Sequence, residues 1–218
     1  MVSGIAWYTD RPEFKSKIHE LRRYLNEIES DHHASETYVN RRGAMVVDVV
    51  TSRQRQYSTR VLKIVRDWAE RNPNQTLEDL VKQPLDQKTF GLRNGETESI
   101  TLVAKGLLAF GEDFNIEGED LIVESWAKAV EDFRFAPKLD PYVGYVDGLG
   151  IALFAYLRKL SGADAIKPDV RVRKRLQNIG FEVPDGSQAL MMLCEILAEE
   201  LKISKSKFDD LLWREPVA

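Results

Sequence analysis

The sequence predicts an all-α protein, built as a two-lobed helical bundle. Apolar residues recur at spacings of three and four along most of the 218 residues, which is the periodicity of helices with one buried face. No run alternates convincingly between apolar and polar residues, so a lone strand would find no partner. Helix-breaking residues interrupt the periodic runs at positions 72–73 (Asn-Pro), 82–84 (Lys-Gln-Pro), 93–95 (Arg-Asn-Gly) and 183–186 (Val-Pro-Asp-Gly).

Three helices are expected in the first part of the chain. The first lies within the first thirty residues and has a helically spaced apolar face made of Phe14, Ile18, Leu21, Leu25 and Ile28. The run from Ala44 to Val50 is rich in β-branched residues, which favour strands. Without a strand partner we expect a buried helix there, because tertiary context overrides weak propensity. The third helix is expected to begin behind a capping Ser58 and to include Trp68.

Four further helices are expected in the second part. An apolar helix runs from Ile151 to Leu160, and a basic helix runs from Val170 to Leu176. A last short helix is expected to begin behind Ser204. The apolar positions of the final two helices are Leu190, Leu193, Leu197 and Leu201, and then Phe208, Leu211 and Leu212.

The composition is that of an ordinary globular protein, with 43% hydrophobic and 30% charged residues. No window approaches eighteen consecutive apolar residues, and the first residues lack the basic-then-apolar order of a secretory signal. The single cysteine, Cys194, excludes an internal disulfide framework and a four-cysteine metal or iron–sulfur site. We therefore expect a cytoplasmic monomer with no membrane partner, no metal and no iron–sulfur cluster.

Two closely spaced glycines are the strongest local signal. Gly148 and Gly150 flank Leu149 immediately before the apolar helix, a spacing that predicts a tight hairpin with outward-pointing backbone amides. Unsatisfied N–H groups and the positive end of a helix dipole suit a phosphate. The alternative is an ordinary glycine-containing turn at a helix end, which is common.

Basic residues gather just beyond this hairpin. The net charge of the chain is −4, yet residues 151–180 contain seven basic residues and only two acidic ones, Asp164 and Asp169. Arg171, Arg173 and Lys174 are the candidates for phosphate contacts, and a solvated helix face is the alternative. Asp169 follows a proline at the start of the basic helix, so it is either a simple N-cap or a functional carboxylate.

These features resemble the helix-hairpin-helix DNA glycosylases of the endonuclease III superfamily. The matching segments occur in the family's order: Val49–Gln54, ending in Ser-x-Gln; Gly91–Ile100; Gly148-Leu-Gly150 with Pro168-Asp169; and Phe208–Trp213. The resemblance implies a protein that removes a damaged or mismatched base from double-stranded DNA by hydrolysing its N-glycosidic bond. It also implies a glycosylase-like fold whose segments are 1–43, packing with the C-terminal lobe, 44–140, the central lobe, and 141–218, the hairpin and the C-terminal lobe.

The resemblance assigns roles to individual residues. Asp169 is the expected catalytic carboxylate, and the hairpin residues, Gln54 and the basic helix are the expected DNA contacts. A monovalent cation at the hairpin is a further expectation. The aromatic residues Tyr57, Tyr142 and Tyr145 are candidates for lining the base pocket, with core packing as the alternative for each.

The sequence also departs from the family. Ala152 stands where the lyase-type members carry a lysine, so we expect base removal without strand cleavage. Arg171 stands where the family often has histidine. These departures leave open a non-catalytic DNA-binding member of the same fold, and a helical protein-interaction module is a third alternative.

Overall fold

The computed structural model describes residues 9–26, 34–183 and 185–214. All regular structure in these residues is helical, and they contain no strand, which confirms the predicted all-α class. The chain divides into two compact units. We call residues 33–163 the central unit, and residues 1–32 with 164–218 the terminal unit. The hairpin segment 141–163 thus belongs to the central unit.

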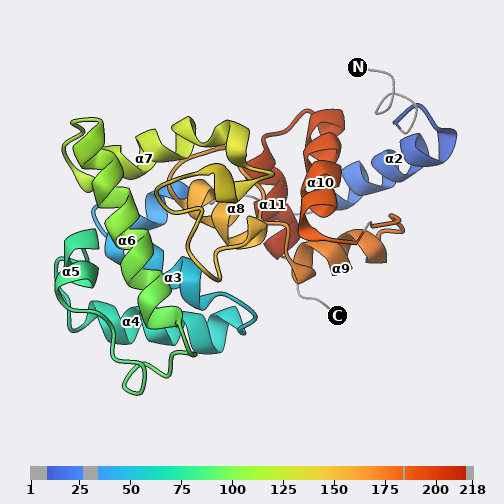
Figure 1. Cartoon of the computed structure of the whole chain (residues 1–218). Coiled ribbons are helices and arrows are strands. Elements are labelled where there is room, and N and C mark those ends of the chain that lie inside the picture. The colour runs from blue at the N-terminus through green and yellow to red at the C-terminus, as the bar shows by residue number, and fades with distance from the viewer. Residues whose placement is uncertain (1–8, 27–33, 184, 215–218) are drawn as a thin grey trace. The chain divides into compact units, whose positions relative to one another are not determined.

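The central unit is organised around α3 (Arg42–Thr51), all of whose residues are buried. This helix contains the β-branched run, so the prediction of a buried helix at Ala44–Val50 is confirmed. It contacts α4 (Leu62–Ala69), α6 (Glu96–Asp113) and α8 (Ile151–Leu160), which are seen around it in Figure 1. Burial on every side explains why strand propensity does not decide the conformation of α3.

Two further α-helices belong to the central unit. They are α5 (Leu77–Lys82) and α7 (Glu119–Ala129), and both contact α3. The carboxylate of Glu119 accepts hydrogen bonds from the backbone N–H of Leu77 at 2.8 and 2.9 Å, so α7 caps the start of α5. Close packing also dictates glycine at position 43, where a Cβ would lie 2.2 Å from the carbonyl oxygen of Thr76.

The helix around Trp68 begins earlier than the sequence predicts. A π-helical turn, η2 (Tyr57–Val61), precedes α4, and its N-cap position is Gln56. Ser58 is therefore inside the helical segment, and its assignment as the cap was wrong. Helix formation extends past Ser58 because the backbone N–H groups of Arg60 and Val61 both reach the carbonyl of Gln56.

The terminal unit combines α2 (Pro12–Asn26) with three C-terminal helices. These are α9 (Val170–Asn178), α10 (Ser187–Leu201) and α11 (Lys205–Arg214). Their predicted apolar faces form one core, which includes Leu21, Val172, Leu176, Cys194 and Phe208. Ser204 caps α11 as expected, since its Oγ accepts from the N–H of Lys207 at 3.2 Å. Ile28 lies outside the described residues.

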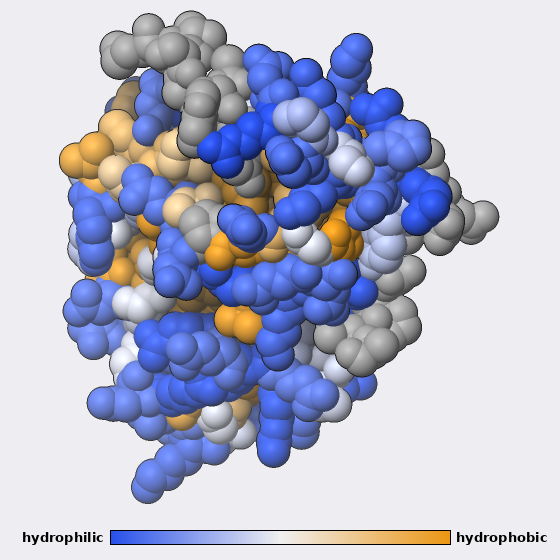
Figure 2. Space-filling view, turned by 90° about the vertical axis from the view of Figure 1, so that its right-hand side faces the viewer, coloured by the Kyte–Doolittle hydropathy of each residue, from blue (hydrophilic) through white to orange (hydrophobic). Residues whose placement is uncertain are grey.

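Hydrophilic residues cover most of the face that Figure 2 shows. None of the helices in the described part of the chain combines the length and the apolar character needed to cross a membrane.

Candidate nucleic-acid interface

The glycine hairpin has the geometry expected of an anion-binding loop. Gly148 and Gly150 are exposed, while Leu149 between them is 3% exposed and anchors the loop in the core. The N–H of Leu149 donates to the carbonyl of Val146 at 3.1 Å. Among the described residues, the N–H groups of both glycines have no acceptor, and α8 begins directly after them without a side-chain cap. Unsatisfied donors at a helix start therefore face solvent here.

No α-helix precedes the hairpin, which corrects the expectation that it lies between two helices. Residues 141–148 form successive turns instead. The fully buried carboxylate of Asp140 accepts hydrogen bonds from the backbone N–H groups of Tyr142, Val143 and Gly144 at 3.0–3.2 Å. It also accepts from Nε1 of Trp126 at 3.2 Å. Sequence reasoning missed Asp140, although an Asp-Pro dipeptide is a known signal for a turn.

Arg53 lies directly against the hairpin. Gly148 has φ +86°, a conformation that favours glycine, and a Cβ added there would lie 2.7 Å from Nη1 of Arg53. The two residues share a cavity of about 310 Å³ that is also lined by Tyr145, Glu98 and Ser99. The hydroxyl of Ser99 donates to the carbonyl of Asp147 at 2.8 Å and so ties α6 to the hairpin.

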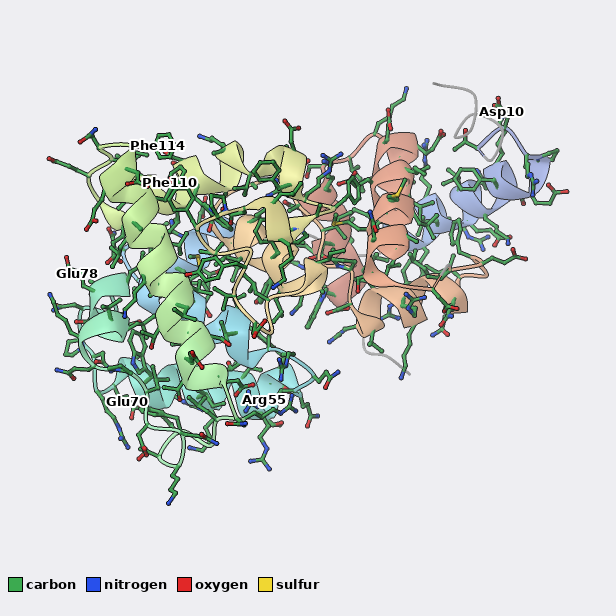
Figure 3. The ribbon with its side chains drawn as sticks, in the orientation of Figure 1. Asp10, Arg55, Glu70, Glu78, Phe110 and Phe114 are labelled. Carbon is green, nitrogen blue, oxygen red and sulfur yellow. The ribbon has the colours of Figure 1, made fainter. Side chains whose placement is uncertain are left out.

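The turn that carries Gln54 is held by two arginines. Gln54 is exposed and has φ +51°, a left-handed conformation that needs support from its surroundings. Arg93 supplies it by donating from Nη1 to the carbonyl of Arg53 at 2.6 Å and from Nη2 to that of Gln54 at 2.9 Å. Arg55, labelled in Figure 3, forms a buried ion pair of 2.7 Å with Glu96, the first residue of α6. The turn is therefore rigidly presented beside the hairpin cavity.

The three tyrosines proposed for a base pocket lie in different surroundings. Tyr145 is 47% exposed and lines the hairpin cavity. Tyr142 packs edge-on against Phe110 at 5.2 Å, and its hydroxyl donates to Asp113 at 2.9 Å. Tyr57 directs its hydroxyl to the buried Asp48 at 2.8 Å. Only Tyr145 is among the residues that line the hairpin cavity.

Asp48 is a buried carboxylate that sequence reasoning missed. It lies in the middle of α3, is fully buried, and accepts hydrogen bonds from the phenols of Tyr38, Tyr57 and Tyr156 at 2.5, 2.8 and 3.3 Å. Burial, followed by the negative charge of Asp48, raises the pKa of all three phenols. The one signal in the sequence was a single carboxylate within an otherwise apolar helical run, where a buried charge requires donors.

Asp169 lies in the terminal unit, at the N-cap position of α9. Its Oδ1 accepts from the backbone N–H groups of Arg171 and Val172 at 2.9 and 3.0 Å, and the residue is half-exposed. The hairpin glycines belong to the central unit. The carboxylate of Asp169 therefore lies in the other unit, at the start of the cation-rich helix α9.

The three cations of α9 that are proposed to contact DNA differ in how many contacts they make within the protein. Arg171 stacks on the ring of Trp213 at 4.5 Å and donates to the carbonyl of that residue at 2.6 Å. Arg173 donates to the carbonyl of Gly186 at 3.2 Å, and Lys174 is exposed. Arg175, which the same run contains, is only 6% exposed. One face of α9 is therefore built into its own unit, and Lys174 is the cation of this run that is most accessible to a partner.

The described residues contain no group of three or more acidic, histidine or cysteine side chains placed to hold a metal ion. Cys194 is buried in the core of the terminal unit, and burial raises the pKa of its thiol. Comparisons of this chain with protein-family models, with curated proteins and with solved structures found no match.

Proposed function

We propose that this protein is a DNA glycosylase that removes a damaged or mismatched base from duplex DNA without cleaving the strand. One observation carries the proposal: an exposed pair of glycines with unpaired amides opens α8. A second feature, the half-exposed carboxylate of Asp169 at the start of α9, supplies a group suited to the chemistry.

The hairpin is the proposed DNA anchor. A phosphate that approaches Gly148 and Gly150 meets unpaired backbone donors, the positive end of α8 and the guanidinium of Arg53. Such contacts position a protein on the duplex without reading its sequence. A monovalent cation at the hairpin remains part of the proposal, because carbonyl groups of the same loop would be its ligands.

Asp169 is the proposed catalytic carboxylate. When the bond between C1′ and the base nitrogen breaks, the base leaves with the electron pair and the sugar becomes an oxocarbenium-like cation. A negative carboxylate beside the sugar stabilises this cation. It then accepts the proton of the water that adds to C1′. Ala152 offers no amine for attack on the sugar, so the reaction ends at an abasic site.

A second candidate function is non-catalytic DNA binding by the same fold. Oδ1 of Asp169 accepts hydrogen bonds from two backbone N–H groups, so a helix-capping role is sufficient to explain an aspartate at this position. The stacking of Arg171 on Trp213 likewise gives that side chain a structural role. Both observations favour a chain that retains a binding surface without an active centre.

A lesion screen with a matched variant separates the two candidates. Purified protein is incubated with labelled duplexes that each carry one lesion, and hot alkali then reveals abasic sites. We expect cleavage of at least one duplex after alkali, none before it, and loss of at least about 100-fold in turnover for Asp169→Asn. Asparagine caps helices about as well as aspartate, so this variant should fold and bind normally. Near-normal turnover in the variant would exclude Asp169 as the catalytic group.

A further inference from the structure

The central unit contains a second hollow that is rich in cations. It is formed by residues 54–67 and 88–93, and its volume is about 650 Å³. We call it the basic hollow. Five of its lining residues are basic, namely Arg55, Arg60, Lys63, Lys88 and Arg93, and one, Asp67, is acidic. Basic residues thus exceed acidic ones by four in the lining of this hollow.

Two of the five cations are neutralised by ion pairs. Arg55 forms the buried pair with Glu96, and its Nη2 donates to the carbonyl of Gly91 at 3.2 Å. Lys63 pairs with Asp67 at 2.5 Å across one helical turn at the surface. Surface pairs of this kind contribute little and exchange readily with other anions.

The other three cations have no carboxylate partner among the described residues. Arg60 and Lys88 are exposed and form no ion pair with the described part of the chain. Asp86, two residues before Lys88, is held by Thr89, whose hydroxyl and N–H donate to it at 2.6 and 2.8 Å. These bonds are the main reason why the pKa of Asp86 is lowered, and the positive charge of Lys88 makes a smaller contribution without forming an ion pair. Arg93 donates to two carbonyl oxygens, which are neutral and leave its charge uncompensated.

The basic hollow adjoins the hairpin cavity through a single rigid turn. Arg53 lines the hairpin cavity, and the next residue, Gln54, lines the basic hollow. Arg93 holds the carbonyls of both. The basic hollow and the unpaired amides of the hairpin thus lie on either side of one turn, which suits a ligand with repeating negative charges better than a single small anion. The hairpin cavity itself is also lined by the carboxylates of Glu96, Glu98 and Asp147, so the groups there that can bind an anion are the backbone amides and Arg53.

We propose that the basic hollow binds the phosphodiester backbone of double-stranded DNA, next to the stretch of backbone that the hairpin holds. The choice of DNA as the polyanion rests on the proposed function. The charge and shape of the hollow are observed independently of that function. Cations that contact phosphates position a duplex and make its binding strongly dependent on salt. Arg60 and Lys88 carry this role, because both are exposed and unpaired within the described residues.

The test is a fluorescence anisotropy titration of a lesion-free labelled duplex over a series of salt concentrations. The variant Arg60→Ala/Lys88→Ala should reduce the slope of log K against log salt by about 1.8, which corresponds to two lost phosphate contacts. At 0.1 M salt its affinity should fall by about one to two orders of magnitude. The matched control is Lys105→Ala/Lys128→Ala, which removes two exposed lysines of α6 and α7 outside the hollow. The control should keep the wild-type slope.

The outcomes separate this proposal from the proposed function. Lesion-free DNA requires no catalysis, so a reduced slope in a protein that removes no base supports the hollow and contradicts the glycosylase. An unchanged slope in a protein that does excise bases overturns the hollow alone. Equal loss of affinity in the control variant would mean that only net charge matters and would also overturn it. Competition by inorganic phosphate or by polyglutamate as strong as that by unlabelled duplex would identify a small-anion or an acidic-protein site instead. The single variant Lys88→Glu, at an exposed position, provides a second reading of the slope.

Discussion

The basic stretch at residues 151–180 can be recognised in the sequence, whereas the basic hollow can be recognised only in the folded structure. The first is dense in the sequence, but four of its seven cations are buried: Arg158, Lys159, Lys167 and Arg175. The second is scattered over residues 55–93, and its Arg60, Lys63 and Lys88 are exposed. Most cations of the basic stretch are therefore buried within the protein. The exposed cations of the basic hollow, which folding brings together, are the ones that a partner can reach.

The difference has a physical cause. Long basic side chains on an amphipathic helix reach across its buried face and satisfy carbonyls and carboxylates there. Arg158 does so within the central unit, where it pairs with Glu131 and donates to the carbonyl of Ala127 at 3.4 Å. Arg60 and Lys88, by contrast, lie on a helical turn and a loop that no described element covers. Substitution of the buried cations should therefore lower the stability of the protein, whereas substitution of the exposed cations of the basic hollow should change the binding of DNA.

The largest effect on stability is expected for Arg158→Ala. The side chain of Arg158 is 1% exposed, and its removal leaves a cavity, takes a donor from the carbonyl of Ala127 and takes one ion-pair partner from Glu131, which also pairs with Arg134 at 3.7 Å. Because Glu131 is 42% exposed, water can solvate it, and we expect a loss of about 2–4 kcal/mol. Urea denaturation at neutral pH measures it. Lys128→Ala, an exposed control on α7, should change stability by less than about 0.5 kcal/mol. Equal behaviour of the two variants would contradict the internal role of Arg158.

The buried carboxylate of Asp48 in the central unit gives a pH-dependent prediction. The pKa values of Tyr38, Tyr57 and Tyr156 are raised by burial and by Asp48. A group whose folded pKa exceeds its unfolded value stabilises the protein fully below the unfolded pKa, here about 10. That contribution is lost as the pH rises above this value. Melting temperatures should therefore fall steeply above about pH 10, and Tyr156→Phe should make the fall shallower. A flat profile up to pH 11 would contradict the cluster.

Much of the fold, but little of the chemistry of its surface, follows from the sequence. The buried helix at Ala44–Val50 was predictable because no strand was present to pair with it. The exposure of Gly148 and Gly150 followed from their spacing. The turns around Asp140 could not be predicted, because they depend on hydrogen bonds that its side chain forms with backbone N–H groups only after folding. The basic hollow and the Asp48 cluster were also hidden, since each combines residues that are far apart in the sequence.

A smaller effect on stability is expected for Arg171→Ala. The variant loses the stacking contact of 4.5 Å on Trp213 and the 2.6 Å hydrogen bond to its carbonyl. We expect a loss of about 1–2 kcal/mol. Arg171→Lys should recover little, because an ammonium group lacks the planar surface that stacks. Lys174→Ala, at an exposed position on the same helix, is the control and should be nearly neutral. If Arg171→Ala weakened DNA binding without lowering stability, the residue would belong with the cations of the basic hollow.

The smallest effect on stability is expected for the double variant of the basic hollow itself. Arg60 and Lys88 are exposed and make no ion pair with the described residues, so their removal takes nothing from the fold. Arg93 and Lys63 remain close by, and the loss of like charges near them relieves repulsion. Urea denaturation of Arg60→Ala/Lys88→Ala should therefore give a stability within about 0.5 kcal/mol of the wild type, with any change in the stabilising direction greatest at low salt. A loss of more than about 1 kcal/mol would mean that these side chains support the central unit in the way that Arg158 does. Unchanged stability together with a weakened salt dependence of DNA binding would place the two sets of cations in different roles.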